Sequence, residues 1–162
     1  MNTYKKRKLY SFILFYLYMI ALCYFLFFAG FFGRVETGRE YHYNLQLFKE
    51  ISRFYHYRHV LGIRAFLLNV VGNIVVFIPF GYFLPIMTIR CQKGLFITIL
   101  TFTTSLVVEV TQLIFKVGSF DVDDILLNTV GGILGYIIYR IHRSWFRRQL
   151  KRKREIRCSE KE

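Results

Sequence analysis

The sequence is poor in the residue types that mark several protein classes. It has two prolines and three cysteines among 162 residues, and only 20% of its residues are charged. The scarcity of proline and charge, beside 54% hydrophobic residues, excludes a collagen-like or a disordered chain. Cys23, Cys91 and Cys158 stand in an apolar run, a short basic loop and the tail, without a Cys-x-x-Cys motif. We therefore expect neither a disulfide scaffold nor a zinc site.

Apolar and aromatic residues are abundant instead, and the charge is unevenly placed. Aromatic residues make up 19% of the chain, more than a soluble domain of this size can bury, so an integral membrane protein is predicted. The net charge of +13 lies mainly at the two ends, beside apolar runs. We interpret it as a topology signal and a contact with anionic lipid headgroups, rather than as nucleic-acid binding.

Four apolar runs predict an all-α protein with four transmembrane helices. They cover residues 9–32, 65–89, 94–115 and 125–139. The first has 24 residues without a charge and could be a signal peptide, but it is long for one, and we favour a retained anchor. We expect a basic segment at 1–8, a membrane domain at 9–139 and a basic tail at 140–162.

The distribution of Lys and Arg predicts the orientation. With both termini in the cytoplasm, the inner segments carry 16 of these residues and the outer segments 7, as the positive-inside rule requires. The loop at 33–64 then lies outside. Leu47, Phe48, Ile51 and Tyr55 recur in it at helical spacing, which indicates a short helix on the outer membrane interface or a segment that packs on the bundle. We expect the tail to continue the last helix along the lipid surface.

Polar residues inside these runs form three sets, each at helical spacing. They are Asn69 and Asn73 in the second run, Ser105, Glu109 and Gln112 in the third, and Asp121, Asp124 and Asn128 at the start of the fourth. The predicted topology places all three sets in the outer half of the membrane. Ionisable side chains are costly there and usually serve a function, so these residues are the candidate site.

Structural roles are the alternative for each of them. Amides in transmembrane helices often only join neighbouring helices, and Glu109 could be a hydrogen-bonded structural carboxyl. Asp121 and Asp123 could belong to a solvated loop, and Asp124 could be a helix cap.

Small residues and prolines in the same runs predict close helix packing and a bend. Gly131, Gly132 and Gly135 lie near Asn128 and would let another helix approach closely. Pro79, followed by Gly81, should bend the second helix because proline removes a backbone hydrogen bond.

The sequence resembles the VanZ-like family of bacterial membrane proteins in these segments. The matching pieces are Asn69-x-x-x-Asn73-x-x-x-Phe77-x-Pro79-Phe80-Gly81, Glu109-x-x-Gln112, the run from Asp121 to Gly135, and an outer-loop piece from Asn44 to Ile51. The resemblance implies a multi-pass protein of the bacterial cell membrane with four core helices. Some members are linked to low-level teicoplanin resistance, and a similarity of fold to enzymes of lipid headgroups has been suggested. This chain departs from the usual pattern at Leu47, where the family has proline, and at Gly118, where many members have arginine.

Two functions follow from the resemblance and the polar residues. In the first, the protein is an enzyme of lipid-linked or phospholipid headgroups. Its catalytic residues would be Glu109 as general acid or base, and Asp121 and Asp124, which would orient the substrate or hold a divalent cation. Asn69, Asn73, Gln112 and Asn128 would bind headgroup oxygens.

In the second, the protein is not an enzyme. It binds the glycopeptide or its lipid-linked cell-wall target and shields the cell. A transporter is disfavoured because the four helices show neither an inverted repeat nor a polar path through the membrane, unless the protein oligomerises. The identity of a metal and the oligomeric state stay open, and membrane lipids are the expected partners.

Overall fold

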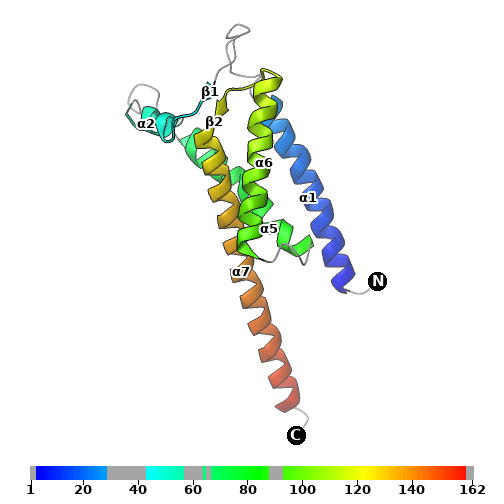
Figure 1. The fold of residues 1–162 in the computed structure, drawn as a ribbon. Coiled ribbons are helices and arrows are strands. Elements are labelled where there is room, and N and C mark those ends of the chain that lie inside the picture. Colours follow the sequence, from blue (N-terminus) through cyan, green and yellow to red (C-terminus); the bar gives the residue numbers. More distant parts are fainter. Residues whose placement is uncertain (1–2, 29–42, 57–63, 65–66, 88–92, 160–162) are drawn as a thin grey trace.

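The computed structural model describes residues 3–28, 43–56, 64, 67–87 and 93–159, and nearly all of them are helical (Figure 1). The elements are α1 (Thr3–Phe28), β1 (Tyr43–Asn44), α2 (Lys49–His56), the π-helix η2 (Leu67–Val71), α5 (Gly72–Met87), α6 (Gly94–Ile114), β2 (Phe120–Asp121) and α7 (Val122–Ser159). The two strands have two residues each. The prediction of an all-α membrane protein is confirmed.

Three helices are long and apolar enough to cross a membrane. They are Asn69–Met87, Gly94–Ile114 and Val122–Arg152, and α1 adds a shorter apolar stretch, Leu9–Tyr24. These segments overlap the four predicted runs, and the last extends well beyond the predicted 125–139. The ends of two runs, residues 29–32, 65–66 and 88–89, lie outside the described residues. Both termini lie at one end of the bundle, and α2, β1 and β2 lie at the other (Figure 1). The cytoplasmic position of the termini stays a prediction.

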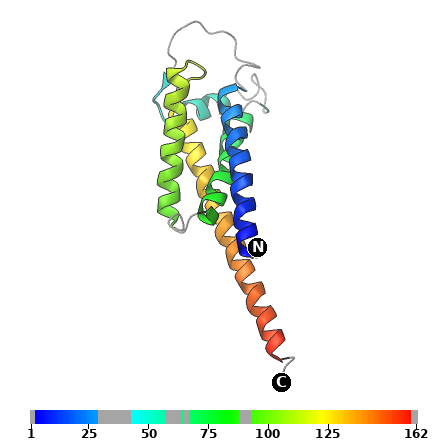
Figure 2. The same ribbon diagram turned by 90° about the vertical axis from the view of Figure 1, so that its right-hand side faces the viewer.

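The helix α7 is the centre of the bundle. It packs along both α5 and α6, and α1 packs on the far side of α5 (Figure 2). The buried face of α6 is mostly polar, whereas its outward face carries exposed side chains such as Leu95, Ile99 and Val107. Polar residues inside and apolar residues outside are the arrangement that a lipid surrounding requires.

Glycines bring α5 and α7 into contact. A Cβ atom on Gly131 would lie 2.2 Å from the carbonyl oxygen of Ile74, and one on Gly135 would lie 2.0 Å from that of Ile78. No side chain fits in that space, so the two backbones approach as closely as small residues permit.

A second glycine contact involves all three core helices. A Cβ on Gly81 of α5 would lie 1.9 Å from the carbonyl oxygen of Gly132, and a Cβ on Gly132 would lie 2.4 Å from the Thr101 hydroxyl of α6. Gly132 therefore sits where α5, α6 and α7 meet.

Two prolines lie inside α5 without ending it. The helix continues from Gly72 to Met87 through Pro79 and Pro85, and the bend expected at Pro79 stays a prediction. Near this point the Tyr18 hydroxyl donates a hydrogen bond of 2.8 Å to the carbonyl of Val76, which fastens α1 to α5.

The last helix extends well beyond the bundle. It has 38 residues and continues past Tyr139, where the fourth apolar run ends, to Ser159. Its basic second half projects from the end that carries the termini (Figure 2).

Candidate functional site

Two short strands join the outer loop to the start of α7. Tyr43 and Asn44 pair in parallel with Phe120 and Asp121. The Asn44 amide nitrogen donates to the Asp121 carboxylate at 3.2 Å, and its amide oxygen accepts from the Gln46 backbone N–H at 3.2 Å. Sequence reasoning did not place Asn44 in the site, although it begins the outer-loop piece that resembles the VanZ-like family.

Asp121 joins α6 to α7. Its carboxylate accepts the backbone N–H of Asp123 at 2.8 Å, so Asp121 is the N-cap of α7. Its own backbone N–H donates to the Glu109 carboxylate of α6 at 3.0 Å. Glu109 is only 2% exposed, and this bond gives its carboxylate a donor in the membrane interior.

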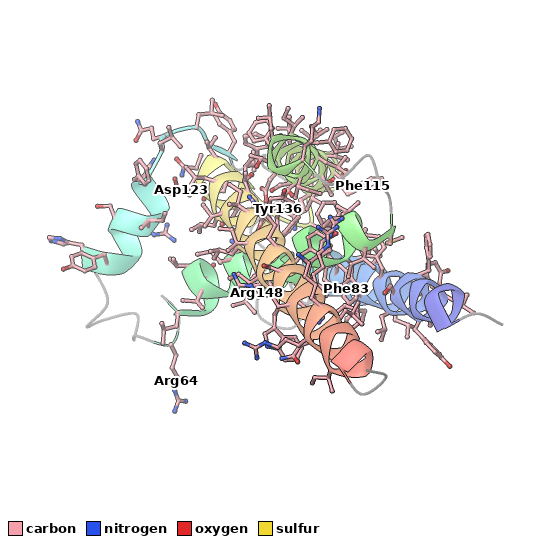
Figure 3. The ribbon with its side chains drawn as sticks, turned by 90° about the horizontal axis from the view of Figure 1, so that it is seen from below. Arg64, Phe83, Phe115, Asp123, Tyr136 and Arg148 are labelled. Atoms are coloured by element: carbon pink, nitrogen blue, oxygen red, sulfur yellow. The ribbon has the colours of Figure 1, made fainter. Side chains whose placement is uncertain are left out.

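Asp123 caps a helix in another part of the chain. Its carboxylate accepts the backbone N–H of Phe48 at 2.5 Å and that of Ile51 at 3.3 Å, at the start of α2. Phe48 has a φ of 62°, a left-handed conformation that costs free energy for a bulky residue and that this bond helps to hold. Figure 3 shows Asp123 at the beginning of α7 beside α2, whereas Arg64 points away from the bundle.

The solvated-loop alternative for these two aspartates is wrong. Asp121 and Asp123 are both buried, and Asp123 is only 1% exposed. Hydrogen bonds explain why carboxylates are buried here: Asp121 accepts the Asn44 side-chain amide and the Asp123 backbone N–H, and Asp123 accepts two backbone N–H groups of the distant segment at α2.

The side chains of Asn73 and Asp124 join α5 to α7. The Asn73 amide donates to the Asp124 carboxylate at 2.5 Å. Asp124 lies in the first turn of α7, whose N-cap is Asp121. Asn73 and Asp124 are half-buried, and Asn69, one turn earlier in η2, is exposed. We call Asn69, Asn73 and Asp124 the surface edge of the site.

Asn128 lies deeper between α6 and α7. Its amide nitrogen donates to the Ser105 hydroxyl at 2.9 Å, and both side chains are buried. Its amide oxygen has no hydrogen-bond partner in the part of the chain that the structure describes. Gln112 is also buried, one turn beyond Glu109 on the same face of α6.

The geometry gives no support to a cation at Asp121 and Asp124. No group of three or more His, Cys, Asp or Glu side chains could hold a metal ion within the described ranges. One oxygen of Asp121 already accepts two N–H groups, from Asn44 and Asp123. These carboxylates serve as acceptors that hold segments together.

Members of all three predicted polar sets thus form hydrogen bonds between segments of the bundle, and the aspartates lie at the end opposite the termini. The buried members join α6, α7 and the outer loop. The surface edge joins α5 to α7 and reaches the exterior.

Comparison with known proteins identifies the family of the chain. A family model described as VanZ/LLP1 matches residues 15–143. The chain belongs to the VanZ/LLP1 family. Protein VanZ of Enterococcus faecium is 36% identical over 74 residues, which are 44% of this chain and 44% of that protein. The similarity thus spans less than half of VanZ, and no solved structure matches. The protein is a multi-pass bacterial membrane protein with a VanZ/LLP1 domain that contains the whole candidate site.

Proposed function

We propose that this VanZ/LLP1 protein binds the polar headgroup of a membrane lipid or a lipid-linked cell-wall precursor at the outer face of the membrane. Bound there, it lowers the susceptibility of the cell to teicoplanin. The observation that carries the proposal is the surface edge. Asn69 is exposed and Asn73 and Asp124 are half-buried, and they carry two amides and a carboxylate near the end of the bundle opposite the termini. Such groups can exchange hydrogen bonds with the oxygens and amines of a headgroup.

The outer position rests on charge. The Lys and Arg residues are concentrated near the two termini, and both termini lie at the end away from the site. The positive-inside rule places that basic end in the cytoplasm and the site at the outer leaflet. The glycopeptide acts from outside, so this is the face where its lipid-linked target would be bound.

Binding is a better match to the geometry than catalysis is. Glu109 is almost fully buried and accepts a backbone N–H, which is the position of a scaffold residue. A general acid or base must reach a proton of the substrate, directly or through one water. An enzyme is the second candidate, and the Glu109 carboxylate in α6 favours it, because a carboxylate inside a membrane helix is costly and usually functional.

The variant Glu109→Gln separates the two functions. Glutamine keeps an oxygen that can accept the Asp121 N–H, but it cannot transfer a proton as a carboxyl group does. For a binding protein we expect protection within about twofold of wild type. In an enzyme that uses Glu109, the turnover rate should fall by about 10²- to 10⁴-fold, and the protection should be lost with it.

The assay is the minimal inhibitory concentration of teicoplanin in a sensitive Gram-positive host. Wild type, Glu109→Gln, Asn73→Ala, the empty vector and a control at an exposed position of α6, Thr103→Val, are compared at equal membrane level on a blot. Asn73→Ala should reduce protection, and Thr103→Val should not. Protection by Asn73→Ala equal to wild type would contradict the surface edge. No difference between wild type and the empty vector would contradict the link to teicoplanin.

A further inference from the structure

The opposite end of the bundle has a second cluster that the proposed function does not use. Where α7 leaves the bundle, a cavity of about 460 Å³ is lined by Tyr136, Tyr139, Arg140, Arg143, Ser144 and Arg147. Arg140, Arg143 and Arg147 follow one another at helical spacing, so their guanidinium groups face the same side of α7. Three arginines on one cavity form a strongly positive site, and a guanidinium group binds phosphate through two parallel hydrogen bonds.

Two tyrosines at the cavity make contacts that hold its lining in place. An Arg143 guanidinium nitrogen donates to the Tyr139 hydroxyl at 3.1 Å, and its central carbon lies 5.9 Å from the centre of the Tyr139 ring. The Tyr136 ring packs on Gly94 at the start of α6, where an added Cβ would lie 2.9 Å from it. All the residues that line the cavity belong to α7, and the Tyr136 contact joins one end of the cavity to the start of α6.

An apolar cavity adjoins the basic one. It has about 330 Å³ and is lined by Ile137, Arg140, Ile141 and Ser144, so the two cavities share Arg140 and Ser144. Ile137 and Ile141 are exposed, in the zone where the apolar part of α7 gives way to its basic part. A positive cavity that continues into an apolar one at the membrane boundary matches the two halves of a phospholipid.

We propose that the two cavities together bind one anionic phospholipid from the leaflet on the side of the termini. Its phosphate lies between the three arginines, and one acyl chain runs along Ile137 and Ile141. Free phosphate would use only the basic cavity, so the adjoining apolar one favours the lipid. This site lies at the other end of the bundle from the surface edge and does not depend on the proposed function.

The test is native mass spectrometry of the full-length protein in detergent micelles. Phosphatidylglycerol and phosphatidylcholine with the same acyl chains are titrated separately. We expect one phosphatidylglycerol per protein to bind at least tenfold more tightly than phosphatidylcholine. Equal retention of the two lipids would overturn the proposal.

Matched double variants distinguish a defined site from general attraction between charges. Arg140→Gln with Arg143→Gln removes two charges from the cavity. Arg148→Gln with Arg152→Gln removes two charges from exposed positions of the same helix that line neither cavity. The first pair should weaken phosphatidylglycerol binding at least tenfold, and the second less than threefold. Equal weakening by both pairs would show only diffuse attraction and would overturn the proposal.

Two further arms test the lipid as the ligand. Glycerol phosphate, which lacks acyl chains, should compete at least a hundredfold more weakly than phosphatidylglycerol, and equal competition would assign the site to free phosphate instead. Ile141→Gln changes an exposed position and leaves the arginines in place, so it tests the site even if the arginine variants fold poorly. It should weaken phosphatidylglycerol binding without changing the response to glycerol phosphate. Unchanged lipid binding in this variant would contradict the path of the acyl chain.

Discussion

Replacing Asp123 by alanine should release α2 from the membrane bundle while the rest of the fold persists. The Asp123 carboxylate accepts two backbone N–H groups at the start of α2, from Phe48 and Ile51. Apolar packing contributes little to holding this segment, because Leu47 and Phe48 before α2 and Tyr55 within it are each more than half exposed. Without the cap, the start of α2 loses its acceptor, and Phe48 has less to hold it in its left-handed conformation.

The size of the effect follows from these two bonds. A hydrogen bond to a charged group contributes about 1.5–3 kcal/mol. The Phe48 bond is short, whereas the Ile51 bond is long at 3.3 Å. We therefore assign the Ile51 bond a free energy at or below the low end of this range. The total is about 2–4 kcal/mol for the local opening of α2, which corresponds to a rise of roughly 30- to 700-fold in amide exchange.

Hydrogen exchange of the purified protein in detergent, read on the peptides of α2, measures this opening. Asp124→Ala is the matched control, since it removes the same charge from the same turn of α7 but faces Asn73 on α5. Asp123→Asn keeps one carbonyl oxygen and should give an intermediate rise. If exchange in α2 changes less than threefold in Asp123→Ala, or changes equally in Asp124→Ala, the cap does not hold α2 and the reasoning fails.

Two other predictions concern the core. Gly132→Ala should destabilise the protein by about 1–3 kcal/mol, because its Cβ would lie 2.4 Å from the Thr101 hydroxyl. Adding Thr101→Ala should recover part of that loss, which thermal melting of the single and double variants would measure. Asn128→Leu should change stability by less than about 1 kcal/mol in the same assay, because the side chain makes one described bond, to Ser105, and leaves its oxygen without a described partner. A loss of several kcal/mol in Asn128→Leu would show that this oxygen has a partner, such as a buried water.

The transmembrane helices and the polar faces could be predicted because both depend on local spacing. An apolar run needs only length and absence of charge, and residues three, four or seven apart share a helix face in any surrounding. The inward-facing positions of Glu109 and Asn128 could therefore be predicted from spacing, and the structure buries both, with hydrogen bonds that join Glu109 to β2 and Asn128 to α6; their roles stay predictions.

The contacts that hold the outer loop could not be predicted because they join distant segments. Asn44 meets Asp121 across 77 positions of the chain, and Phe48 meets Asp123 across 75. Asp123 carries no local sign of this, since an aspartate at a helix start suits a solvated turn equally well. The exposure of Asn69, in a π-helical turn, also departs from the regular spacing on which its position was predicted.

The three aspartates at the start of α7 each hold a different segment of the chain, and this difference bears on the proposed function. Asp121 holds β1, Asp123 holds α2 and Asp124 holds α5. Only the last of these bonds is between two half-buried side chains, so its loss should cost about 1.5 kcal/mol, the low end of the range for a bond to a charged group. Under the proposed function a headgroup exchanges with this bond, its amine or hydroxyl donors binding Asp124 and its oxygens accepting from the freed Asn73 amide, while the bonds of Asp121 and Asp123 keep α6 and α2 in place. Asn73→Ala should accordingly reduce protection against teicoplanin with little change in membrane level, whereas Asp123→Ala should change the exposure of α2 first.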